Sequence, residues 1–242
     1  MNIVILGATG GIGSSILSHL KDENNIYFGS KSISKINDLM SNTANKNILK
    51  GSQIDASNFD EMKGFIDNAN KELGSIDCII NCVGSILLKP AHTTTEDELL
   101  DVLKTNLFSC FSIIKYSFKY LRKNGGSIIF FSSAAAKVGL KNHEAISSAK
   151  GAISSLVQSS ASTYAKYNIR INAIAPGLVD SPLTKHIVEN EISLDFSKKM
   201  HALNKIGETK NFIPAIDFLI NPRSDWITGQ TISIDGGLSN LK

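Results

Sequence analysis

The sequence lacks long apolar runs, dense basic stretches and metal-binding motifs, and each absence removes a class of protein. No uninterrupted apolar segment approaches about 18 residues, so no transmembrane helix is expected. The first residues lead directly into an apolar segment without a basic region or a cleavage site, so no secretory signal is expected. The net charge is only +3, and no Lys/Arg run could follow a nucleic acid backbone.

Cysteine is scarce, and its placement argues against disulfides and metal. Cys78, Cys82 and Cys110 are odd in number and fall within apolar segments, which is typical of buried free thiols in a reducing cytoplasm. Cys78 and Cys82 are too far apart for a C-x-x-C motif, and no H-E-x-x-H motif is present. We therefore expect a cytoplasmic protein without a metal site.

The chain does contain a regular alternation of strand-like and helix-like segments. Hydrophobic residues make up 42% of it and charged residues 19%, which suffices for a full core. With no linker, repeat or low-complexity block, residues 1–242 are expected to form one domain. The alternation predicts an α/β fold with a doubly wound parallel sheet of about seven strands and helices on both faces. The expected strands are residues 2–6, 26–29, 48–54, 76–82, 127–131, 170–175 and 231–234.

Helices are expected between these strands, and one segment has no regular pattern. Ser57 is the expected cap of the helix over residues 59–73. A polar, irregular segment of about residues 181–202 is typical of a substrate lid. The other expected helices are residues 12–20, from about 34 onward, 96–123, 143–167 and 210–219.

The amino-terminal segment, residues 2–13, is the strongest local indication of a ligand. A short uncharged apolar run predicts a strand buried on both faces, and Ile12, Ile16 and Leu20 then recur at helical spacing. A glycine-dense turn joins the two. This geometry aims backbone N–H groups and a helix N-terminus at a phosphate, so we expect nucleotide binding.

The glycine spacing in this turn differs from the common dinucleotide fingerprint. G-x-G-x-x-G is absent, and the glycines stand as G-x-x-x-G-x-G with an additional one at Gly10. We expect Gly7 to make the exit from the strand, Gly11 to let the backbone approach a pyrophosphate, and Gly13 to allow close helix packing. The alternative is an ordinary tight strand-to-helix connection, but the position at the end of a buried strand favours nucleotide binding.

The second expected strand lacks an acidic residue at its end. A carboxylate there often holds the ribose 2′-hydroxyl of a dinucleotide. Ser30 and Lys31 lie instead where a 2′-phosphate could be met, which favours NADP(H) over NAD(H). The alternative is that Lys31 is a solvated surface charge.

Polar and glycine residues follow several other expected strands at the same end. Asp55 follows the third strand, Asn81 to Gly84 the fourth, Ser133 the fifth and Pro176-Gly177 the sixth. Ligands of parallel sheets bind at the carboxyl ends of the strands, so this convergence is stronger evidence than any single motif. Asn106 lies within an otherwise apolar helical run, where its amide needs a hydrogen-bonding partner.

Together these segments resemble the short-chain dehydrogenase/reductase family over essentially the whole chain, with similarity to its 3-oxoacyl-ACP reductases. The turn from Gly7 to Gly13 is similar to the family's cofactor turn, and Asn81-Cys82-Val83-Gly84 resembles its Asn-Asn-Ala-Gly motif with two substitutions. Further similar segments are Asn172 to Gly177, Ile227-Thr228-Gly229-Gln230 and Asp235-Gly236-Gly237.

The resemblance implies roles for individual residues. It implies that Ser133 hydrogen-bonds the substrate oxygen, that Asn106 is the catalytic-helix asparagine, and that Lys150 binds the nicotinamide ribose. Asp55 stands where the family contacts the adenine ring, and Ser181 replaces a threonine that meets the carboxamide. The implied cofactor-binding residues are Gly7, Thr9, Gly10, Gly11, Ile12, Gly13, Ser30, Lys31, Asp55, Asn81, Val83, Gly84, Lys150, Pro176, Gly177, Val179 and Ser181.

One departure from the family pattern affects the chemistry. The family's Tyr-x-x-x-Lys motif places a tyrosine four residues before the lysine, on the same helical face. Ile146 occupies that position here, and its spacing of 13 residues after Ser133 agrees with the family. The literal Tyr27 to Lys31 match runs through the end of an expected strand, where the two side chains do not share a helical face.

Isoleucine cannot supply the proton that carbonyl reduction requires at oxygen, and losing a positioned general acid typically costs about 10²–10⁴ in rate. Three interpretations follow. The first is a reductase with another proton source, either water relayed through Asn106 and Lys150 or a titratable neighbour, His143 or Glu144. The second is a nucleotide-binding pseudoenzyme acting as a sensor or silent subunit. The third is a different reaction, such as hydride transfer to an activated C=C bond.

The retained Ser133, Asn106 and Lys150 favour the first interpretation, and a capping or surface role is preferred for His143. We therefore expect an NAD(P)(H)-dependent oxidoreductase of small carbonyl or alcohol substrates, with no nucleic acid or membrane partner. The resemblance implies a homotetramer or dimer formed through the helices of Asn106 and Lys150 and the C-terminal strand. Apolar residues that suit either that interface or a core are Ala152, Ile153, Leu156 and Val157.

Overall fold

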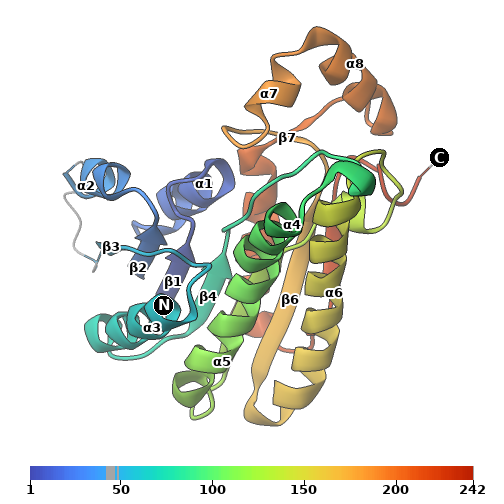
Figure 1. The fold of residues 1–242 in the computed structure, drawn as a ribbon. Helices are drawn as coiled ribbons and strands as arrows, with labels where there is room; N and C mark the ends of the chain where they lie inside the picture. The colour runs from blue at the N-terminus through green and yellow to red at the C-terminus, as the bar shows by residue number, and fades with distance from the viewer. Residues whose placement is uncertain (42–46, 48, 242) are drawn as a thin grey trace.

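Seven parallel strands form the central sheet of the computed structural model, which describes residues 1–41, 47 and 49–241. Their order is β3-β2-β1-β4-β5-β6-β9, which confirms the expected doubly wound fold (Figure 1). The order reverses between β1 and β4, the point at which such sheets open a crevice for ligands. The strands are β1 Asn2–Leu6, β2 Asn25–Ser30, β3 Leu49–Gln53, β4 Cys78–Asn81, β5 Gly126–Phe131, β6 Ile169–Pro176 and β9 Thr231–Ile234.

Helices cover both faces of the sheet because successive strand residues point to opposite sides. Val4 and Leu6 of β1 pack with the helices drawn in front in Figure 1, whereas Ile3 and Ile5 pack with those behind. The front helices are α3 Phe59–Leu73, α5 Ser109–Leu121 and α6 Glu144–Tyr164. The opposite layer contains α1 Gly11–Leu20, α2 Ile33–Ser41 and α9 Ile213–Ile220.

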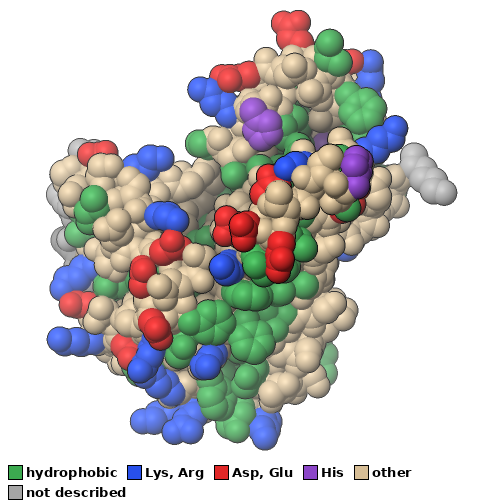
Figure 2. Space-filling model, viewed as in Figure 1, with side chains coloured by type: hydrophobic (Ala, Val, Ile, Leu, Met, Phe, Trp, Pro, Cys, Tyr) green, Lys and Arg blue, Asp and Glu red, His purple; other side chains and the backbone are tan. Residues whose placement is uncertain are grey.

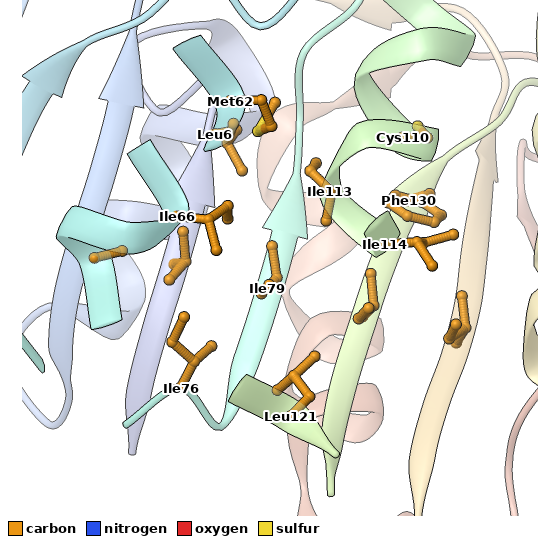
Figure 3. Close-up of a cluster of buried hydrophobic side chains, with 14 of the residues drawn as sticks. Leu6, Met62, Ile66, Ile76, Ile79, Cys110, Ile113, Ile114, Leu121 and Phe130 are labelled. Carbon is orange, nitrogen blue, oxygen red and sulfur yellow. The ribbon is translucent and has the colours of Figure 1, made fainter. Parts of the chain in front are cut away.

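The front core is a continuous layer of aliphatic and aromatic side chains. Figure 3 shows Leu6 and Ile79 of the sheet together with Met62 of α3 and Ile113 of α5. All four side chains are fully buried. None of the helices in the described part of the chain is long and apolar enough to cross a membrane.

Residues 96–121 are helical without a break, close to the expected helix over 96–123, but a π-helical turn lies within this helix. Helix α4 covers Glu96–Leu103, a π-helical turn covers Lys104–Phe108, and α5 follows. Asn106 lies in the middle of the π turn, and its side-chain Nδ2 donates to the carbonyl oxygen of Val102 at 2.9 Å. A wider turn at this position is a common feature of functional sites.

Two further expectations are corrected. The cap of α3 is Asn58, whose side chain accepts from the N–H groups of Asp60 and Glu61, whereas the Ser57 hydroxyl donates to Asp55. The lid contains α7 Lys185–Val188 and α8 Glu191–Met200, so it is helical rather than irregular. A small two-stranded sheet of β7 Val179–Asp180 and β8 Gly207–Glu208 was not predicted. Residue 48, in the expected third strand, lies outside the described residues.

Candidate active site

The candidate site lies where the carboxyl ends of the strands meet the lid, at the top of Figure 1. The residues expected to bind a cofactor follow β1, β2, β3, β4, β5 and β6, and the parallel sheet brings these strand ends to one edge. The lid begins directly after β7, the short strand that follows β6. Its Ser181 lies against the glycine turn, because a Cβ placed on Gly11 would be only 2.8 Å from the Cβ of Ser181.

The glycine turn after β1 has the backbone shape that a pyrophosphate site requires. Gly7 adopts a φ of +72°, which L side chains rarely adopt. A Cβ on Gly13 would lie 2.2 Å from the carbonyl oxygen of Gly7, so only glycine lets α1 start this close to the strand. Gly10 precedes α1 and has no side chain to cap it, so the first-turn N–H groups can donate hydrogen bonds to an anion. The turn therefore fits the phosphates of a dinucleotide.

A polar cluster joins the ends of β1, β2 and β3. The hydroxyls of Thr9 and Ser30 hydrogen-bond each other. Lys31 Nζ lies 2.8 Å from Asp55 Oδ2, and the Ser57 hydroxyl donates to Asp55 Oδ1 at 2.6 Å. Hydrogen bonds from Lys31 and Ser57 lower the pKa of Asp55 to about 2. Lys31 is thus an exposed cation whose partner is a single carboxylate.

Asn81 shapes the segment that follows β4. Its Nδ2 donates to Ser109 Oγ and to Cys110 Sγ, both at 3.3 Å, and its Oδ1 accepts from the N–H of Val83 at 3.1 Å. These bonds direct the chain toward Gly84. A Cβ on Gly84 would lie 3.2 Å from Asn106 Oδ1 and 3.4 Å from Lys150 Nζ, so both groups lie beside this glycine.

Asn106 finds the partners that its burial requires. Its Nδ2 donates to Ser85 Oγ at 2.9 Å in addition to the bond with Val102, and its Oδ1 accepts from the N–H of Ser85 at 3.3 Å. The side chain is fully buried. Ser85 was not identified from the sequence, since nothing in its local pattern indicates a partner 21 residues away.

Lys150 extends from α6 to the end of β5. Its Nζ donates to the carbonyl oxygen of Phe131 at 2.8 Å, and the residue is 8% exposed. Burial lowers the pKa of Lys150 to about 8. The hydroxyl of Ser132 donates to the Lys150 carbonyl oxygen at 2.8 Å and ties α6 to the same strand end.

Ser133 starts a short 3₁₀ turn, Ala134–Ala136, directly after β5. Its Oγ accepts from the N–H of Ala135 at 3.1 Å. Because the oxygen is the acceptor in this bond, the hydroxyl hydrogen remains available to a substrate oxygen.

Ile146 lies one turn before Lys150 and is 5% exposed. It packs with Val102 and Ala149, and the partly buried Leu87 and Leu103 complete this apolar cluster. The position at which the family resemblance implies a tyrosine is therefore surrounded by hydrocarbon.

The two titratable neighbours of this turn are accounted for by local structure. His143 stands at the N-terminus of α6, and its Nδ1 lies 2.7 Å from the Lys141 carbonyl oxygen. Glu144 is exposed. His143 occupies the N-cap position, but within the described part of the chain its side chain makes no capping hydrogen bond and contacts a carbonyl outside the helix instead.

The end of β6 is linked to the lid by a buried histidine that the sequence did not single out. His201 Nδ1 lies 2.6 Å from the Ser197 carbonyl oxygen, and its Nε2 accepts from the N–H of Leu178 at 3.2 Å. A Cβ on Gly177 would lie 2.6 Å from that Nε2, so glycine is required beside the ring. Val179 is buried in β7, next to these contacts.

Comparison with known proteins agrees with this architecture. Residues 7–239 match the family model described as Enoyl-(Acyl carrier protein) reductase. A chloroplastic tropinone reductase homologue of Arabidopsis thaliana is 30% identical and covers 99% of this chain and 76% of its own length. A second homologue from the same plant is 31% identical over 99% of this chain and 94% of its own length.

Solved structures extend the likeness to three dimensions. ElxO with NADP bound is 28% identical with a TM-score of 0.90, covering 98% of each chain. Ligand-free aldohexose dehydrogenase of Thermoplasma acidophilum is also 28% identical, with a TM-score of 0.88, covering 100% of this chain and 95% of that one. The chain belongs to the short-chain dehydrogenase/reductase family, whose members are NAD(P)-dependent oxidoreductases acting on CH–OH and C=O groups.

Proposed function

We propose that this protein is an NADP(H)-dependent oxidoreductase that transfers a hydride to or from a small carbonyl or alcohol substrate without a tyrosine proton donor. The observation that carries the proposal is the meeting of three groups at the end of β5. Ser133 has a hydroxyl hydrogen to donate, Lys150 reaches the last carbonyl of the strand, and Asn106 Oδ1 lies beside Gly84 together with Lys150 Nζ.

The residues at the strand ends fit the proposed cofactor. The turn from Gly7 to Gly13 would hold the pyrophosphate, and Lys150 would hold the nicotinamide ribose. Ser30 and Lys31 would meet a 2′-phosphate, and this is the basis for favouring NADP(H) over NAD(H). When bound, the reduced cofactor supplies the hydride.

The chain's own groups would orient the substrate. The Ser133 hydroxyl would donate to the carbonyl oxygen and stabilise the negative charge that develops there. The apolar cluster around Ile146 would exclude water from one side of the pocket. The substrate class most in keeping with the family resemblance is a ketone or a 3-oxoacyl thioester.

We further propose one dinucleotide-binding domain over residues 1–242, with a substrate lid over about residues 181–202, and a cytoplasmic location in keeping with three free thiols. A homo-oligomer, either a tetramer or a dimer, is proposed from the surface beside α5. Figure 2 shows hydrophobic side chains gathered on this face. Of the four α6 residues expected at an interface, Ile153 and Val157 are buried in the core. The other two, Ala152 and Leu156, line an apolar surface depression together with Phe59, Leu107, Phe108 and Phe111.

NADPH oxidation with a panel of ketones and 3-oxoacyl thioesters tests the function, with wild type measured beside Ile146→Tyr. Turnover by the wild type, abolished in Ser133→Ala, is the expected result. The proposal would be contradicted if the wild type binds NADPH without turnover while Ile146→Tyr is active. That result would identify the natural protein as a nucleotide-binding pseudoenzyme.

A further inference from the structure

Lys150 carries a buried amine with few partners. An ammonium has three N–H donors, and the bond to the Phe131 carbonyl oxygen uses one of them. Among the described residues, no carboxylate forms an ion pair with Lys150. The positive charge of the ammonium is therefore not neutralised by an ion pair within the described part of the chain.

The groups that face this amine are neutral. The titratable side chains that act on it are the thiols of Cys110 and Cys82, whose pKa values burial raises to about 11 and about 12. Both thiols are thus protonated at neutral pH. The Asn106 carbonyl oxygen lies beside Gly84, as Lys150 Nζ does, and carries no charge either. Among the described residues, no charged side chain acts on the amine, and burial outweighs the opposing effect of the two thiols, so the pKa of Lys150 is lowered.

The same stretch of α6 offers no competing proton donor toward the apolar cluster. Ile146, one turn before Lys150, is packed with Val102 and Ala149 and has no exchangeable proton. His143 is engaged with a local carbonyl at the helix start, and Glu144 is exposed to solvent. Lys150 is thus the buried ionisable group on the helix that should hold the proton donor.

We propose that Lys150 is itself the general acid of the reaction, and this inference rests on the proposed function. During reduction, the carbonyl carbon gains a hydride with its electron pair, and the π electrons move to oxygen. That oxygen takes a proton from Lys150 Nζ, so one N–H bond breaks and a neutral amine remains. Solvent water reprotonates the amine after the alcohol leaves. In the oxidation direction, the neutral amine accepts the alcohol proton.

The ionisation of Lys150 suits this role. Burial brings its pKa to about 8, whereas an ordinary lysine is charged until far above neutral pH. A general acid is most effective when its pKa lies near the working pH. Both forms of the amine are then populated under physiological conditions.

The first test does not depend on activity. We would follow the ¹³Cε resonances of the full-length protein against pH, with Lys150→Met to assign the signal. Lys150 is expected to titrate near pH 8, well below the ordinary lysine value of about 10.4. A midpoint at that ordinary value would overturn the inference.

Chemical rescue is the second test, with the panel carbonyl that wild type reduces fastest. Lys150→Ala is expected to lose about 10²–10⁴ in kcat, and added methylammonium should restore part of it. Guanidinium, which holds its proton too tightly, and tetramethylammonium, which has none, should not. Equal rescue by all three cations, or no rescue by methylammonium in a variant that still binds NADPH, would assign Lys150 a purely electrostatic role and overturn the inference.

The two proposals fail in different ways. If wild type binds NADPH but reduces no carbonyl of the panel, the proposed function is wrong and this inference falls with it. If wild type is active and Lys150→Arg keeps kcat within about tenfold, only the inference is wrong, because arginine does not release its proton near neutral pH.

Discussion

Lys31 and Asp55 are joined by an ion pair of 2.8 Å that links the ends of β2 and β3. The lysine side chain is 81% exposed and the carboxylate 35%, so the pair is well solvated and weak. A phosphate group carries more negative charge than a carboxylate and can replace Asp55 as the partner of the Lys31 ammonium. The pair therefore keeps a cation at the position where a 2′-phosphate would arrive.

Lys31→Ala should weaken NADPH binding and leave NADH binding nearly unchanged. The loss of one charge-assisted hydrogen bond is expected to raise the Kd for NADPH about tenfold, which corresponds to about 1.4 kcal/mol. Fluorescence titration of both dinucleotides measures the effect. Lys35→Ala, in exposed α2, is the matched control and should change neither affinity. Equal loss of NADPH and NADH affinity in Lys31→Ala would contradict this assignment.

Gly13→Ala should destabilise the protein and abolish dinucleotide binding. The added methyl group would meet the Gly7 carbonyl oxygen at 2.2 Å, and overpacking of this kind typically costs about 1–3 kcal/mol. Urea unfolding measures the change. Gly64→Ala is the control, because its Cβ would meet nothing within 4 Å on helix α3, and it should stabilise by roughly 0.5–1 kcal/mol. Similar behaviour of the two variants would show that the turn is not tightly packed.

The buried amine of Lys150 should make the stability of the fold depend on pH in the alkaline range. The folded protein releases this proton near pH 8, whereas the unfolded chain holds it until about 10.5. Between these values the unfolded state binds more protons, so the free energy of unfolding rises with pH, by about 3 kcal/mol at most. Below pH 8 the amine is charged in the folded state, so its burial lowers the free energy of unfolding by the full amount.

Urea unfolding of wild type and Lys150→Met between pH 7 and 11 isolates this contribution. The wild-type free energy should rise relative to the variant across the window from 8 to 10.5. Parallel curves for the two proteins would mean that the amine ionises in the folded state as it does in water.

Phe111→Glu should shift the proposed oligomer toward monomers. Phe111 is 53% exposed on α5 and lines the apolar depression beside α6, so a carboxylate there would be buried unpaired in an interface. Light scattering after size-exclusion chromatography measures the mass. Phe196→Glu, on the exposed side of the lid helix α8, is the control and should leave the mass unchanged. An unaltered mass for Phe111→Glu would locate the interface elsewhere or exclude it.

The sheet could be predicted from the sequence because each strand is a short apolar run followed by a turn. The same pattern placed Gly7 and Ser133 after their strands, whereas Lys150 was identified only through the family resemblance. The ion pair between Lys31 and Asp55 could not be predicted, because it depends on the parallel pairing of two strands separated by a helix.

Two features, the π turn within the predicted helix and the lid helices, were not predicted for local reasons. The π turn at Asn106 reflects competition of a side-chain amide for a backbone carbonyl, which hydrophobic periodicity does not report. The lid helices bury little apolar surface, and in α8 the buried residue is Ser197, so the polar sequence there resembled a loop. Both features were found only from the three-dimensional structure.

Isotope transfer tests the central claim, hydride delivery to a carbonyl, most directly. Wild type would be incubated with NADPH deuterated at the transferable position, separately on each face of the nicotinamide, and a ketone or 3-oxoacyl thioester of the panel. Mass spectrometry should find one deuterium at the carbinol carbon of the product from one of the two cofactors, and far less product with Ser133→Ala. Alcohol without deuterium from either cofactor, or no alcohol despite bound NADPH, would contradict the account.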